Sequence, residues 1–129
     1  MPRSYPRNPI TIGEHIRKKR IELKLLQSDV ARIFQISSDC VTYWENNRSI
    51  PQINYFPQIV DFLEYCPLEF DKKSLSGRLK AYRWINGLSY KKLGKLLEVD
   101  GSTVAAWEKG GNIPTIKKQK KIEMLLKKR

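Results

Sequence analysis

The sequence contains few of the residues from which enzyme active sites and metal centres are built. It has one histidine, His15, and two cysteines, Cys40 and Cys66. The cysteines lie far apart and match no metal-ligand spacing, so we expect free thiols and no bound metal. The seven glycines form no phosphate-binding loop, and no carboxylates pair at a catalytic spacing. The sequence therefore predicts no catalytic residues, no cofactor and no enzyme activity.

Long apolar runs are also missing. No segment approaches the roughly 20 apolar residues of a membrane-spanning helix, and the N-terminal residues contain no signal-peptide core. We therefore expect no membrane partner and a cytoplasmic, nucleoid-associated protein. Hydrophobic residues still make up 40% of the chain, which is enough for packed cores.

Acidic residues are scarce in the second half of the chain. Residues 1–70 carry nine basic and eight acidic residues, a net charge of +1. Residues 71–129 carry sixteen basic and five acidic residues, a net charge of +11. This asymmetry favours a polyanionic partner for the second half. On charge alone, a merely solvated basic surface is an equally good interpretation.

A pattern over residues 27–48 recurs 63 positions later, over residues 90–111. The pairs that match across this offset are Arg20 and Arg83, Leu25 and Leu88, Val41 and Val104, Trp44 and Trp107, Glu45 and Glu108, and Ile50-Pro51 and Ile113-Pro114. The repeat predicts an all-α fold of two tandem small helical bundles, each with a helix-turn-helix. We expect an extended N-terminal arm at 1–10, a first domain at 11–66, a linker at 67–74 and a second, strongly basic domain at 75–129.

Capping signals define the helices of the first copy. Thr11 and Glu14 form a capping box at the start of a helix that ends near Leu23. Further helices are expected at 27–34, 38–46 and 53–65, with Ser37 capping the second of these three. The apolar periodicity predicts these inward side chains: Ile12, Ile16, Leu23, Val30, Ala31, Phe34, Val41, Trp44, Ile53, Phe56, Val60 and Leu63.

The second copy has equivalent signals. Helices are expected at 77–86, after the cap Ser89, at 101–109 after the cap Asp100, and from Thr115 onward. The inward side chains should be Leu79, Tyr82, Leu93, Gly94, Leu97, Val104, Trp107, Ile116, Ile122 and Leu125 or Leu126. We also expect Arg20 to form a bidentate pair with Glu45, and Arg83 to pair likewise with Glu108.

Several motifs together resemble the Cro/phage-repressor family, also called the XRE family. In the first copy these are Arg20, Leu25-Leu26-Gln27, Val30-Ala31, Ile36-Ser37 and residues 41–46. In the second copy they are Arg83 and residues 87–89, 99–104 and 107–110. The resemblance implies a lambda-repressor-like fold whose recognition helices, near 38–46 and 101–109, enter the DNA major groove. Two departures stand out: Gln35 and Glu98 replace the usual turn glycine and should take positive φ, and Tyr90 replaces a preferred glutamine.

The resemblance also assigns residues to the DNA. It implies base contacts from Ser38, Asp39, Thr42 and Tyr43 and from Gly101, Ser102, Ala105 and Ala106, with Cys40 and Thr103 at the border. It places Gln27, Asn47 and Arg48 near phosphates, and the charge of the second copy adds Lys91, Lys92 and Lys109. The predicted function is sequence-specific binding of double-stranded DNA by a transcriptional regulator, more readily a repressor than an activator.

Other interpretations stay open at this point. An antitoxin-like or adaptor protein would use the same units to bind a protein partner, and RNA binding is a weaker choice. The chain could act as a monomer or a homodimer. No domain is left over for a small-molecule effector, so none is expected. Arg3 and Arg7 belong either to a disordered terminus or to an arm that follows the DNA minor groove.

Overall fold

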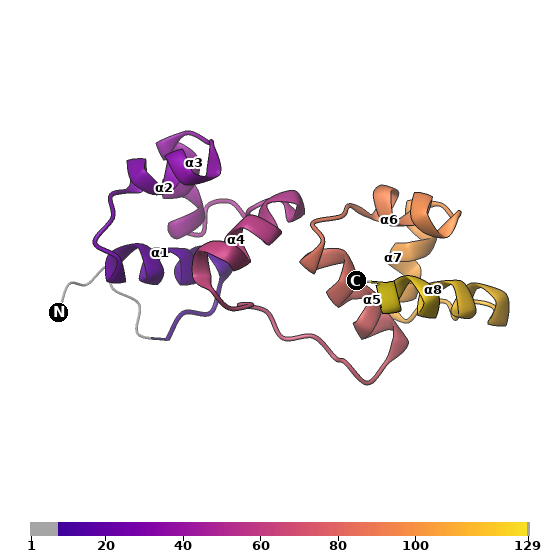
Figure 1. Cartoon of the computed structure of the whole chain (residues 1–129). Helices are drawn as coiled ribbons and strands as arrows, with labels where there is room; N and C mark the ends of the chain where they lie inside the picture. The colour runs from indigo at the N-terminus through magenta and orange to yellow at the C-terminus, as the bar shows by residue number, and fades with distance from the viewer. Residues whose placement is uncertain (1–7, 129) are drawn as a thin grey trace. The chain divides into compact units, whose positions relative to one another are not determined.

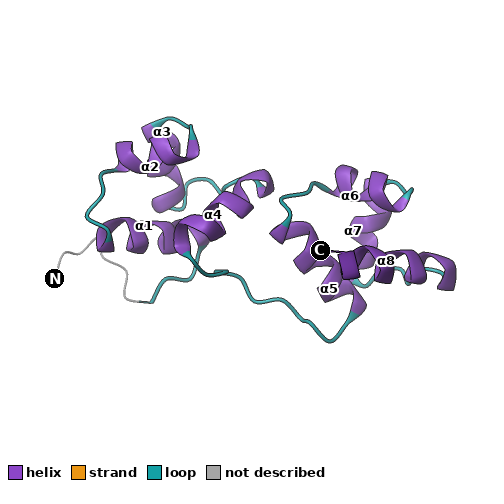
Figure 2. Cartoon of the chain, in the orientation of Figure 1, coloured by secondary structure: helices purple, strands orange, loops and turns teal. Residues whose placement is uncertain are grey.

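The computed structural model describes residues 8–128, and within that range the chain forms helices and loops without strands (Figure 2). The all-α prediction is confirmed. The chain divides into two compact units, unit 1 (Met1–Leu68) and unit 2 (Glu69–Arg129), which are described separately below. Arg3 and Arg7 of the predicted N-terminal arm lie outside the described residues.

Unit 1 is a bundle of short helices (Figure 1), and side-chain caps fix the starts of the first and the third of them. The Thr11 hydroxyl accepts a hydrogen bond from the Glu14 N–H, and the Glu14 carboxylate accepts one from the Thr11 N–H, so the predicted capping box is present. Ser37 accepts from the Cys40 N–H as expected. The elements are α1 (Ile12–Glu22), α2 (Gln27–Phe34), α3 (Ser38–Glu45), the 3₁₀ helix η1 (Ile53–Tyr55) and α4 (Phe56–Leu63).

The core of unit 1 is aromatic at its centre. Trp44 of α3 meets Phe34 edge-on, with the ring centroids 5.9 Å apart, and meets Tyr55 at 5.5 Å. Such edge-to-face contacts are the favoured geometry for aromatic pairs. The predicted burial of Val30, Ala31, Phe34, Val41 and Trp44 is confirmed.

Three details of the unit 1 prediction are wrong, two of them at helix ends. Leu23 is exposed because it is the C-cap of α1 and no longer on the helix face. α4 buries Ile59 and leaves Val60 half-buried, because the helix begins at Phe56 and turns its i, i+3 and i+7 positions inward. It stops at Leu63, before the expected end at residue 65, since Glu64 adopts a left-handed φ of 68°.

Unit 2 contains α5 (Leu75–Ile85), α6 (Tyr90–Leu97), α7 (Gly101–Lys109) and α8 (Ile116–Lys128). α5 begins two residues before the expected Gly77 because Ser74 caps it, accepting from the Gly77 N–H at 3.0 Å. Asp100 has the extended backbone of an N-cap, but its carboxylate makes no capping hydrogen bond. Ile116 is 72% exposed at the start of α8, so its predicted inward position is wrong. The buried core comprises Leu79, Leu93, Leu97, Val104, Trp107 and Ile122.

The two units share the conformation of their turns. Positive φ angles occur in pairs 63 residues apart, at Lys24 and Gly87, Gln35 and Glu98, and Asn47 and Gly110. The expected left-handed conformation of Gln35 and Glu98 is confirmed, with φ of 57° and 61°. In the turns at Gln35 and Glu98, the backbone N–H two residues past the helix end, that of Ile36 or Val99, donates to a helix carbonyl at 2.9 Å. The backbone therefore follows equivalent turns in both units.

Candidate nucleic-acid interface

A buried ion pair fixes α3 to α1. Arg20 Nε donates to Glu45 Oε2 at 2.7 Å and its Nη2 donates to Oε1 at 2.9 Å, while Nη1 donates to the Leu25 carbonyl at 3.0 Å. In unit 2 the Arg83–Glu108 distances are 2.6 and 2.9 Å, and Nη1 donates to the Leu88 carbonyl. Both predicted bidentate pairs are confirmed. They hold the C-terminal ends of α3 and α7 in place from behind.

The first residue of α2 and of α6 contacts this ion pair in two different ways. Gln27 Nε2 donates to Glu45 Oε1 at 3.1 Å, and Gln27 Oε1 accepts from the Thr42 hydroxyl at 2.8 Å. Tyr90, in the equivalent place, has its ring centroid 4.0 Å from the guanidinium carbon of Arg83. This cation–π contact explains how a tyrosine replaces a glutamine there. The amide of Gln27, expected near phosphate, is therefore hydrogen-bonded within unit 1.

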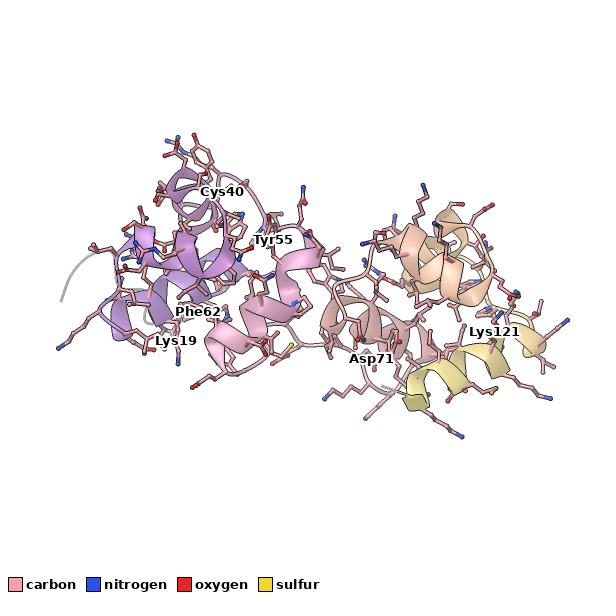
Figure 3. All side chains as sticks on the ribbon, turned by 45° about the horizontal axis from the view of Figure 1, so that its top comes forward. Lys19, Cys40, Tyr55, Phe62, Asp71 and Lys121 are labelled. Carbon is pink, nitrogen blue, oxygen red and sulfur yellow. The ribbon has the colours of Figure 1, made fainter. Side chains whose placement is uncertain are left out.

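The outer face of α3 is polar. Ser38, Asp39 and Tyr43 are exposed, whereas Cys40 and Thr42 are half-buried. Cys40 is labelled on its ribbon in Figure 3. The Thr42 hydroxyl donates toward Gln27, so the outward contact available from Thr42 is its methyl group. α3 thus presents a hydroxyl, a carboxylate, a phenol and a methyl, which are groups that bind base edges in the major groove.

The loop after α3 is held in place. Asn47 Oδ1 accepts from the Thr11 hydroxyl at 2.7 Å, and Asn47 Nδ2 donates to Glu14 at 3.0 Å. The backbone N–H of Ile10 is the main cause, and Asn47 the next, of the lowered pKa of the Glu14 carboxyl. Arg48 follows with an exposed side chain, and its N–H donates to the Tyr43 carbonyl at 2.8 Å. The structure therefore leaves Arg48 available to a phosphate and uses the Asn47 amide to anchor the loop.

α7 presents a surface of small residues. Ser102 and Lys109 are exposed, and Thr103, Ala105 and Ala106 are half-buried. The small side chains of this set allow close approach to DNA, and its two hydroxyls, on Ser102 and Thr103, lie at the N-terminal end of α7, but the set has few groups that distinguish bases.

Two glycines in unit 2 have a packing role; that of Gly94, expected to be buried, was predicted from the sequence, and that of Gly101 was not. A methyl group on Gly101 would lie 2.9 Å from the Lys91 backbone nitrogen, and one on Gly94 would lie 2.5 Å from the Val99 carbonyl oxygen. Glycine at both positions lets α6 and α7 approach more closely than side chains would permit. Gly101, expected to face a base, lies against the backbone of α6. The signal available in the sequence was the occurrence of Gly94 and Gly101 on either side of the turn between α6 and α7.

Five lysines of unit 2 fall into two groups. Lys91, Lys92 and Lys109 are exposed on α6 and α7. On α8, Lys118 Nζ donates to the Leu97 carbonyl at 3.2 Å, and Lys121, labelled in Figure 3, pairs with Glu98 at 2.8 Å. That pairing is the main cause of the lowered pKa of Glu98. The first group is available to phosphates, whereas the second also holds α8 against α6.

Within residues 8–128, no three histidine, cysteine or acidic side chains gather in a way that could hold a metal ion. In the same part of the chain, no helix has the length and apolar character needed to span a membrane. Cys40 and Cys66 are free thiols.

Comparison with known proteins matches part of the chain to a family. The family model described as Helix-turn-helix (HTH_3) matches residues 79–129. This is a family of Cro/C1-type, XRE-like DNA-binding domains and not of enzymes, so the match supports a DNA-binding role in transcription regulation. Searches of the curated proteins and of the solved structures found no match. Membership of residues 11–66 in the same family stays a prediction.

Proposed function

We propose that the protein is a transcriptional repressor that binds a specific double-stranded DNA site, with α3 and α7 in the major groove. The observation that carries this proposal is the shared scaffold of the two units. Each unit holds its recognition helix through a buried arginine–glutamate pair and turns the other face of that helix outward. Repression requires only that the protein occupy its site, which two small DNA-binding units are sufficient to do.

The two units contribute differently to binding. Unit 1 supplies sequence preference, because the Asp39 carboxylate accepts a hydrogen bond from a cytosine amino group and the Thr42 methyl contacts a thymine methyl. Unit 2 supplies affinity, because its exposed Lys91, Lys92 and Lys109 neutralise phosphates whatever the sequence. The charge balance supports this division, since +11 of the net +12 lies in residues 71–129.

Selection of binding sites from random duplexes tests both parts. The Asp39→Ala variant should lose discrimination at one position, by about 1–3 kcal/mol, and keep binding to non-specific DNA. The double variant Lys91→Ala, Lys92→Ala should bind every duplex more weakly without changing the selected sequence. A change of sequence preference in the lysine variant alone contradicts the division of roles.

A second candidate function is that of an adaptor or antitoxin-like protein. Apolar side chains are exposed on unit 1 at Leu26, Ile33, Tyr43 and Ile50, and this half of the chain has almost no net charge. Large apolar side chains that are exposed and gather in a patch are common at protein interfaces. Co-purification of a stoichiometric partner, together with failure to protect any duplex from nuclease, would favour this function over DNA binding.

A further inference from the structure

Unit 2 contains a cavity of about 310 Å³ beside Trp107. Its walls come from α5, α7, α8 and the loop between α7 and α8. Apolar side chains form most of the surface, and polar groups are few. The lining residues are Leu75, Ser76, Leu79, Trp107, Gly110, Asn112, Ile113, Pro114, Gln119 and Ile122.

An aromatic ring stands at the equivalent place in unit 1. Trp44 and Ile59 are buried there, as are Trp107 and Ile122, the residues 63 positions later. Phe56 is only 1% exposed, and the residue 63 positions after it is Gln119. Gln119 is half-buried and its Nε2 donates to the Pro114 carbonyl at 2.8 Å. The phenyl ring of unit 1 is therefore replaced in unit 2 by the smaller, half-buried side chain of Gln119.

The loop at the edge of this cavity also differs from the equivalent loop of unit 1. In unit 1 the Asn47 amide bonds to Thr11 and Glu14 and so ties the loop to α1. Gly110 takes the place of Asn47 and Gly77 that of Glu14, so neither side chain of this link exists in unit 2. Nothing lies within 4 Å of the position where a Cβ of Gly110 would stand. Gly110 and Gln119 both line this cavity. The loss of the aromatic ring and the loss of the hydrogen-bonded link to the first helix therefore occur at the same place.

We propose that this cavity binds a small aromatic molecule, one ring system in size and with one hydrogen-bonding group, such as an indole or a phenol. The equivalent phenyl ring of Phe56 indicates the shape and chemistry of the occupant. The volume is sufficient, because engineered apolar cavities of roughly 150 Å³ hold benzene. Ser76, Asn112 and Gln119 supply polar groups for the substituent, and the apolar walls cover the ring.

The bound molecule would contact the recognition helix through Trp107. A ligand that binds better to one position of α7 changes the DNA affinity of unit 2, and DNA changes the affinity for the ligand by the same factor. This consequence rests on the proposed function, whereas binding of the small molecule does not. The sequence predicted no effector because no domain is left over for one; a cavity within the DNA-binding unit requires no additional domain.

The test is titration of the whole protein with indole and with phenol, followed by ¹H–¹⁵N NMR without DNA. One of these compounds should cause saturable shifts of the protein's amide resonances, and the largest shifts should fall at Leu75, Trp107 and Ile122. Gln119→Phe fills the cavity and should weaken binding at least tenfold. Lys120→Phe adds the same ring at an exposed position of α8 and should leave binding unchanged.

A second variant guards against a folding defect in the first. Gly110→Asn places a side chain at a lining position of the cavity and should also weaken binding; asparagine tolerates the positive φ there, as Asn47 does at 63° in unit 1. The proposal is overturned if neither compound shifts these residues up to its solubility limit, or if folded Gln119→Phe and Gly110→Asn bind as tightly as the unaltered protein. Loss of DNA binding alone leaves these NMR results unaffected, so failure of the proposed function is detected separately.

Discussion

The positive charge and the hydrogen-bond donors of the Arg83 guanidinium find nearly all their partners inside unit 2. It binds both oxygens of Glu108, donates to the Leu88 carbonyl and lies on the ring of Tyr90. Only 6% of the Arg83 side chain and 3% of the Glu108 side chain are exposed. Each charge is therefore tolerated only because the other is present. Arg78 and Glu123 form a second bidentate pair, but their side chains are 38% and 40% exposed.

Glu108→Ala should destabilise unit 2 by about 3–5 kcal/mol, because it leaves the buried Arg83 charge uncompensated. Urea unfolding followed by circular dichroism measures the loss. Glu123→Ala breaks the exposed pair in the same unit and is the matched control, with a much smaller expected effect. Equal losses of unfolding free energy in the two variants would show that burial does not make the Arg83–Glu108 pair more costly to break.

His15 makes the stability of unit 1 depend on pH. Burial, followed by the nearby positive charge of Lys18, lowers the pKa of His15 below 6.5, although Glu14 opposes this shift. Its Nδ1 lies 2.6 Å from the Tyr65 hydroxyl. The unfolded chain takes up the proton near pH 6.5, at a higher pH than the folded chain, so stability should fall as pH drops from 6.5 toward the folded pKa.

Thermal unfolding between pH 7.5 and 5.5 checks this dependence. His15 is the only histidine in the sequence, so NMR titration of its ring reports the folded pKa without overlap. In His15→Gln the decline of melting temperature over this range should be smaller. An unchanged decline would assign the pH dependence to other groups.

The short helices were predictable because their signals are local. Caps at Thr11, Ser37 and Ser89 and the apolar periodicity depend on neighbouring residues only. The errors arose where tertiary structure decides the outcome, as at the exposed Ile116 and at Ile59, which is buried in place of Val60. Ile59 and Val60 lie about 100° apart around the helix, and the packing of α4 against its neighbours decides which of them faces the core.

The candidate site was less predictable than the helices. Its scaffold could be found because Arg20 and Glu45 recur together 63 residues later. The sequence did not show that the amides of Gln27 and Asn47 bond within unit 1, since both interactions join segments distant along the chain. Nor did it show that Gly101 lies against α6, because a close approach of two backbones leaves only the absence of a side chain in the sequence.

Gln35→Gly should stabilise unit 1 by roughly 0.5–1 kcal/mol. Its φ of 57° is strained for a residue with a Cβ, whereas glycine accepts it, and the gain is reduced by the greater freedom of glycine in the unfolded chain. Chemical denaturation measures the difference. Arg32→Gly, three residues earlier within α2, should instead destabilise by about 1 kcal/mol, because that position is helical. Destabilisation by Gln35→Gly would mean that its side chain contributes more than the turn strain costs.

At the scale of the whole molecule, the charge of the second half is divided between internal and external use. Lys118 and Lys121 on α8 already have partners in unit 2, whereas Lys91 and Lys92 on α6 are exposed. A net charge therefore overstates the number of lysines that neutralise phosphates. The salt dependence of DNA binding counts those lysines directly.

The slope of log affinity against log salt should become less steep by about 1.8 in the double variant Lys91→Ala, Lys92→Ala, since each phosphate contact contributes about 0.9. Fluorescence anisotropy with a labelled duplex at several salt concentrations measures the slope. Lys118→Ala removes a charge that donates to a carbonyl, and its slope should match the unaltered protein. Equal changes in both variants would indicate a general charge effect instead of specific phosphate contacts.

The contacts that close each unit lie within that unit. The Arg20–Glu45 and Arg83–Glu108 pairs each span 25 residues, and the Arg78–Glu123 pair spans 45. Small helical domains fold within microseconds to milliseconds, whereas a ribosome adds about 5–20 residues per second. The first unit should therefore reach its native state while the second is still being synthesised. The nascent chain would then expose one unfinished core of about sixty residues at a time, which limits misfolding between two similar sequences.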